Sequence, residues 1–95
     1  MKITVDFLSL PNIVKRIGSK SVVLDFSGTT VRELVREVAG KYGSDVQRFL
    51  LDEEGNLDMS LSLTVNQQEW IRYHQMDRPL RDGDRVTIMM LVAGG

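Results

Sequence analysis

The stretch TTVRELVREVAGKYG, residues 29–43, decides the fold, because the hydrophobic period of the chain changes there. Its apolar residues recur at intervals of three and four, which places them on one stripe of an α-helix. They are Val31, Leu34, Val35, Val38, Ala39 and Tyr42. Thr30 and Glu33 have the spacing of a capping box, and Gly43 suits a left-handed stop at the other end. The stretch therefore predicts an amphipathic helix.

Alternating stretches on both sides of this helix predict strands with one buried face each. They are KITVDFL (2–8), SVVLDFS (21–27), LDMSLSLTVN (57–66) and the last strand, 85–92. In the third strand, Met59 is expected to be buried. Residues 9–20 are expected to form a loop with one helical turn at 13–17, residues 46–51 an apolar cluster, and residues 70–73 a short strand.

Helix and sheet must bury their apolar faces on each other. The predicted fold class is therefore α+β, with a mixed sheet of about four to five strands and one main helix packed across it. The first and last strands are expected to be neighbours at the centre of the sheet. We expect a single domain over residues 1–95, with residues 92–95 as a flexible C-terminal tail.

Composition narrows the possible functions. The chain has 95 residues, a net charge of -1 and no cysteine, which excludes disulfides, thiolate metal sites and a cysteine nucleophile. Without a basic excess to neutralise phosphates, a nucleic-acid partner is disfavoured. No apolar run approaches the ~20 residues of a membrane span. We expect a cytoplasmic protein with no nucleic-acid or membrane partner and no metal or cofactor bound by the chain itself.

Two small basic groups stand out in the sequence. One is Lys15, Arg16 and Lys20, and the other is Arg78, Arg81 and Arg85. Scattered surface charge is the favoured interpretation of both.

The run RPLRDGDRVTIMMLVAGG, residues 78–95, carries a family resemblance. Its parts are Pro79-Leu80, the turn Asp82-Gly83-Asp84, the strand Val86–Val92 and the terminal Gly94-Gly95. It resembles the tail of the ubiquitin-like sulfur carriers, which include the small subunit of molybdopterin synthase and the thiamine sulfur carrier. The resemblance implies a β-grasp fold, and the molybdopterin branch is the most similar. However, Met90 and Leu91 stand where many molybdopterin-type members have two prolines.

The resemblance also implies a chemistry. An ATP-dependent activating enzyme would adenylate the Gly95 carboxylate, and a sulfur donor would convert it to a thiocarboxylate. A sulfur-receiving enzyme, such as the large subunit of molybdopterin synthase, would then take the sulfur. Gly94 and Gly95 suit this role because glycine lets one backbone approach another closely. The chain would be a carrier and co-substrate, not an enzyme, and a monomer when alone; the activating enzyme would use the ATP.

Partner enzymes would need an apolar docking patch on the domain. Leu8 falls on the polar face of its strand, and Trp70 lies in an irregular segment. Met89 follows Ile88 in the last strand, so the two side chains project to opposite faces. The tail residues Met90, Leu91, Val92 and Ala93 are also expected to contact the partners. For Leu8, Met89 and Trp70, completion of the core is the competing interpretation.

Three hypotheses remain open at this point. The first is a sulfur carrier for molybdopterin synthesis, with thiamine or transfer-RNA thiolation as alternative pathways. The second is a ubiquitin-like modifier joined through Gly95 to lysines of target proteins. The third is a binding module of the same fold with an inert tail.

Overall fold

The computed structural model describes residues 1–90. Its elements follow the order β1 (Lys2–Leu8), α1 (Pro11–Ile17), β2 (Ser21–Asp25), α2 (Val31–Lys41), α3 (Ser44–Leu50), β3 (Leu61–Val65), β4 (Glu69–Trp70), a 3₁₀ turn η1 (Tyr73–Gln75) and β5 (Arg85–Met90). The alternating and helical stretches of the sequence thus form the expected kinds of element.

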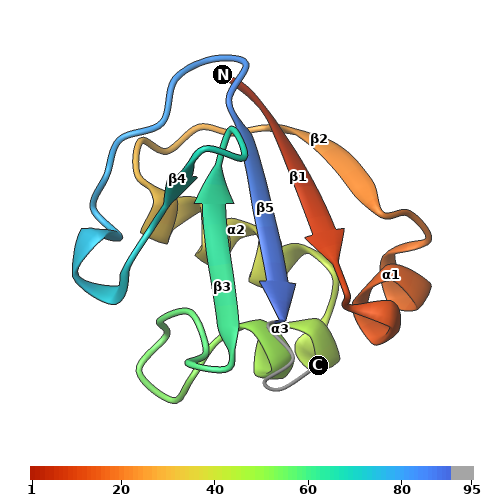
Figure 1. Ribbon diagram of the computed structural model, residues 1–95. Coiled ribbons are helices and arrows are strands. Elements are labelled where there is room, and N and C mark those ends of the chain that lie inside the picture. The colour runs from red at the N-terminus through yellow and green to blue at the C-terminus, as the bar shows by residue number, and fades with distance from the viewer. Residues whose placement is uncertain (91–95) are drawn as a thin grey trace.

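The five strands form one mixed sheet in the order β2-β1-β5-β3-β4. The first and last strands, β1 and β5, run parallel at its centre, with Val5 opposite Val86. The pairs β1–β2 and β3–β5 are antiparallel. Figure 1 shows β5 between β1 and β3. The predicted fold class and the central pairing of the two terminal strands are confirmed.

Helix α2 begins with the predicted capping box. The Thr30 hydroxyl accepts a hydrogen bond from the Glu33 N–H at 3.2 Å, and the Glu33 carboxylate accepts one from the Thr30 N–H at 3.1 Å. Hydrogen bonds from the backbone and hydroxyl of Thr30 and from the backbone of Thr29 lower the pKa of Glu33. These bonds satisfy donors that the helix start leaves free.

The core lies between one face of the sheet and helices α2 and α3, which lie behind the sheet in Figure 1. The apolar stripe of α2 is buried there, as are alternate residues of the central strands. These are Ile3, Val5 and Phe7 of β1, Leu61, Leu63 and Val65 of β3, and Val86 and Ile88 of β5. The period of each element therefore sets the side that it buries.

The prediction of a strand from residue 57 is wrong at its start. Strand β3 begins only at Leu61, and Met59 is 90% exposed instead of buried. The Asp58 carboxylate accepts hydrogen bonds from the hydroxyl and the N–H of Ser60, and these bonds lower its pKa. Asp58 thus stabilises a turn that breaks the alternation.

The sequence predicted one main helix, whereas the structure also contains the shorter helices α1 and α3. Residues 44–50, which include most of the apolar cluster predicted at 46–51, form α3, which buries Val46 and Leu50. Residues 11–17, expected as a loop with one helical turn, form α1, with Pro11 at its start and left-handed Gly18 (φ 89°) after its end. The short strand expected at 70–73 is displaced to Glu69–Trp70.

The structure describes β5 as far as Met90, and the predicted strand residues 91–92 and the predicted flexible tail, residues 92–95, lie outside the described residues. In the described part of the chain, no helix has the length and apolar character needed to cross a membrane.

Candidate functional site

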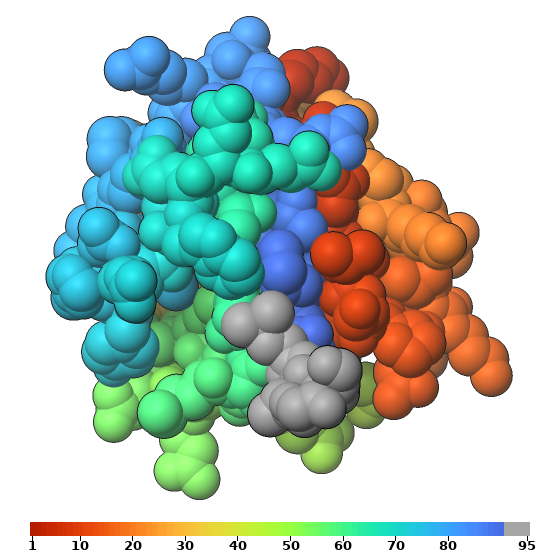
Figure 2. Space-filling view, in the orientation of Figure 1, coloured from red at the N-terminus to blue at the C-terminus, as the bar shows by residue number. Residues whose placement is uncertain are grey.

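The face of the sheet opposite α2 and α3, here called the open face, is turned toward the viewer in Figures 1 and 2. Residues directly opposite each other on paired strands project on the same side of a sheet. Leu8 of β1 pairs with Met89 of β5, and Met89 pairs with Ser62 of β3. These three residues form a cross-strand row at the end of the sheet where β5 ends.

The next row of the open face includes Trp70. Thr87 of β5 pairs with Thr64 of β3, and Thr64 pairs with Trp70 of β4. The sheet therefore gathers Leu8, Met89 and Trp70, the three docking residues proposed from the sequence, on one face. These residues are far apart in the sequence. Their common face could not be predicted, because the sequence does not reveal the pairing register of β3, β4 and β5.

Two of these three side chains are exposed to solvent and do not belong to the hydrophobic core. Leu8 is 55% exposed and Trp70 is 52% exposed. Met89 is half-buried and lies outside the core cluster. Exposure of large apolar side chains on one face of a domain is typical of a surface that binds a partner.

Met90 differs from the other predicted contact residues. It pairs with Leu61, is half-buried and packs against the core cluster, on the side opposite to Met89. Strand alternation gives this result, because neighbouring residues of a strand project to opposite faces. Met90 therefore does not belong to the open face. The other predicted site residues of the tail, Leu91, Val92, Ala93, Gly94 and Gly95, lie outside the described residues.

The centre of the open face is polar but closely packed. Thr64 and Thr87 are each 5% exposed, and neither hydroxyl has a hydrogen-bond partner among the described residues. Arg85 donates a hydrogen bond to Asp6 at 2.7 Å across the central strand pair. Polar residues thus lie between the Leu8–Met89 pair and the end of the sheet where β5 begins.

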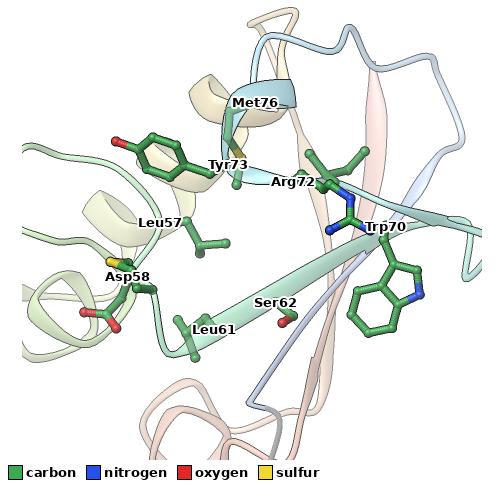
Figure 3. Close-up of a pocket in the computed structure, with 10 residues that line it drawn as sticks. Leu57, Asp58, Leu61, Ser62, Trp70, Arg72, Tyr73 and Met76 are labelled. Atoms are coloured by element: carbon green, nitrogen blue, oxygen red, sulfur yellow. The ribbon is translucent and has the colours of Figure 1, made fainter.

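A pocket of about 420 Å³ lies beside the open face, between the start of β3 and the segment after β4. Figure 3 shows Trp70 and Tyr73 at two ends of this pocket, with Leu57 and Leu61 between them. Tyr73, which is 62% exposed, was not among the residues singled out from the sequence. The available signal was the same as for Trp70: an aromatic residue in an irregular segment.

At its opposite end, β5 is held by the predicted turn. Gly83 adopts a left-handed conformation (φ 88°), and the Lys2 N–H donates to the Asp82 carboxylate at 2.7 Å. Asp84 accepts hydrogen bonds from the Arg81 N–H at 2.8 Å and from the Asn66 side chain at 3.0 Å. Partial burial raises the pKa of Asp84, but these hydrogen bonds, with the nearby charges of Arg78 and Arg81, outweigh it and lower the pKa overall.

The family comparison agrees with this arrangement of elements. The family model for ThiS matches residues 10–95, which is nearly the whole chain. The chain belongs to the ThiS family. It is therefore a member of the ubiquitin-like sulfur carrier family, as the resemblance of residues 78–95 implied. No curated protein sequence matches it significantly.

Solved structures similar to this ThiS-family chain cover it almost completely. A chain of the BexX/CysO complex from Amycolatopsis orientalis is 32% identical, with a TM-score of 0.69, over 98% of this chain and 99% of its own. Urm1 from Trypanosoma brucei is 28% identical (TM-score 0.75, 99% and 95% coverage). SAMP1 from Haloferax volcanii, at 18% identity and TM-score 0.78 over 100% of both chains, supports the fold alone. The expected β-grasp fold is confirmed.

Proposed function

We propose that this ThiS-family protein carries sulfur as a thiocarboxylate on Gly95. The family match carries this proposal, because it extends through the terminal Gly94-Gly95. The expectation that the chain is a carrier and co-substrate, with no cofactor of its own, follows from the same proposal. So does a cytoplasmic location, where thiols stay reduced.

The proposed chemistry has two steps at the terminal carbon. The Gly95 carboxylate attacks the α-phosphorus of ATP on the activating enzyme, which forms an acyl adenylate and releases pyrophosphate. Hydrosulfide from a sulfur donor then attacks the carbonyl carbon, and AMP leaves. A free carboxylate cannot undergo the second step, because its oxygen is a poor leaving group. The activating enzyme would therefore supply the catalytic groups, and this chain the reacting atom.

The open face supports a docking role in this scheme. Leu8 and Met89 form a cross-strand pair at the end of β5, one residue from the last described residue, Met90. A partner that binds this pair would therefore be close to the point where the chain continues toward Gly95. Ordering each tail residue costs about 1–2 kcal/mol, and contacts with Leu8, Met89 and Trp70 would offset that cost. Methionine suits this task because it repacks easily against different partners.

For the receiving enzyme, we propose the large subunit of molybdopterin synthase. The support is the resemblance of residues 78–95 to the molybdopterin branch. Thiamine synthesis and transfer-RNA thiolation are the alternatives, and conjugation to lysines would be a different use of the same activated terminus.

Intact mass spectrometry tests the proposal. The protein is incubated with Mg·ATP, the activating enzyme of its own organism and a sulfide donor. Replacement of one terminal oxygen by sulfur is the expected result, whereas higher-mass conjugates would indicate a modifier. Deletion of Gly95 should abolish the exchange and leave the thermal midpoint unchanged. An unmodified wild-type protein beside an activating enzyme that is competent on another carrier would overturn the proposal.

A further inference from the structure

A second hollow, of about 400 Å³, lies at the end of β1. The Leu8–Met89 pair stands between it and the pocket that Trp70 and Tyr73 line. Its apolar lining includes Leu8, Leu10, Pro11 and Val14, and its charged lining consists of Lys15 and Lys20. We call it the lysine hollow. It combines an apolar surface with two cationic side chains beside the proposed docking residue Leu8.

The backbone makes this hollow by a sharp change of direction after β1. Ser9 has a left-handed conformation (φ 58°), which is uncommon for a residue other than glycine. It leaves Leu8 exposed on one side and buries Leu10, which is 2% exposed, on the other. Helix α1 then starts at Pro11 and brings Lys15 to the hollow, while the chain returns to β2 through Lys20. Residues separated along the chain thus converge on one concave surface.

The charge of the hollow is not balanced locally. Neither Lys15 nor Lys20 makes an ion pair within residues 1–90, whereas the neighbouring carboxylate of Asp6 is paired with Arg85 at 2.7 Å. No Asp or Glu lines the hollow. In a chain with net charge -1, this local excess of positive charge attracts an acidic surface.

We propose that the lysine hollow docks an acidic segment of the activating enzyme, with an apolar side chain seated against Leu8 and Val14 and carboxylates beside Lys15 and Lys20. This rests on the proposed function, since it requires an enzyme that adenylates Gly95. Two observations support it: the positive charge of the hollow, which no ion pair within residues 1–90 balances, and the continuity of the hollow with the open face through Leu8. The activating enzyme is the chosen occupant because every function of the activated Gly95 passes through it.

Electrostatic contacts at an exposed surface mainly accelerate association and are screened by salt. The hollow should therefore influence the concentration of carrier that the activating enzyme needs, and not the turnover of bound carrier. It should also make that concentration dependent on ionic strength.

The test is ATP–pyrophosphate exchange catalysed by the activating enzyme of the same organism, with Mg·ATP and radiolabelled pyrophosphate, as a function of carrier concentration. Lys15→Glu/Lys20→Glu should raise KM for the carrier at least tenfold at low salt, leave kcat unchanged and weaken the salt dependence. Lys15→Arg/Lys20→Arg should keep the wild-type KM. Lys41→Glu/Arg48→Glu makes the same change in net charge on the helices that cover the other face of the sheet and should also keep it.

The outcomes separate this proposal from the proposed function. Absence of exchange with the wild-type protein would overturn the proposed function. Wild-type exchange with an unchanged KM in Lys15→Glu/Lys20→Glu would overturn only the lysine hollow. The lysine hollow would also be overturned if the charge reversal affected only sulfur transfer, because the occupant would then be the receiving enzyme. The same holds if the wild-type protein is a dimer that the charge reversal dissociates, because the occupant would then be a second copy of the chain. Thermal midpoints of all variants check that the exposed substitutions leave the domain folded.

Discussion

The two faces of β5 differ in what their residues contact. Val86 and Ile88 are fully buried against the helices, whereas Met89 lies half-buried on the open face beside exposed Leu8. One strand thus contributes to the core with alternate residues and to the proposed docking surface with the others. Substitutions on the buried side of β5 should therefore change stability, and substitutions on its open side should change recognition.

The largest expected effect follows from substitution of neighbouring residues on opposite faces. Ile88→Ala removes a side chain that is 1% exposed and should lower the free energy of unfolding by about 2–5 kcal/mol. Met89→Ala should lower it by less than about 1 kcal/mol. Urea denaturation of the two variants measures the difference. Equal losses would show that the two faces contribute equally to stability and would remove the basis of the comparison.

The next effect concerns recognition alone. Leu8→Asp should raise KM for the carrier in ATP–pyrophosphate exchange at least tenfold, which corresponds to about 1.4 kcal/mol, because the charge would oppose an apolar contact. Val23→Asp is the matched control. Val23 is also a large apolar residue on the open face, 63% exposed, but it lies on the edge strand β2 opposite Thr4, away from Met89. The same rise in both variants would mean that the open face has no localised docking site.

The smallest effect is at the start of β5. The pKa of Asp84 is lower in the folded protein than in the unfolded chain, where it is about 4. The ionised Asp84 carboxylate therefore stabilises the fold above that unfolded pKa, and this stabilisation is lost as the pH falls through the lower folded pKa. Asp84→Asn should therefore cost about 1 kcal/mol near neutral pH, and this difference should shrink on acidification. Thermal midpoints from about pH 7 to pH 3 test it. A difference that stays constant with pH would show that the Asp84 charge does not contribute.

The sequence predicted best where a local period or cap determines the structure. Thr30 and Glu33 fixed the start of α2, and alternation identified β1, β2 and β5. The failure at Met59 has a local cause, since the hydrogen bonds between Asp58 and Ser60 terminate the alternation earlier than the apolar pattern suggests. Helix α3 was missed because its seven residues are too few to display a full helical stripe.

The candidate site was predictable residue by residue but not as a surface. Leu8 and Trp70 stood out as apolar side chains without a core position, and the structure exposes both. Their arrangement required the register of β1, β5, β3 and β4, which depends on contacts between distant parts of the chain. For the same reason, Lys15 and Lys20 resembled scattered charge in the sequence, although the fold brings both to one hollow.

The central position of β5 has a consequence for the synthesis of the protein. Strand β5 follows the other described strands in the sequence but pairs with both β1 and β3, so these two central pairings cannot form until residues 85–90 have emerged from the ribosome. Such non-local pairing also makes folding comparatively slow. A nascent chain that stops before β5 therefore lacks both the completed domain and the terminal glycines.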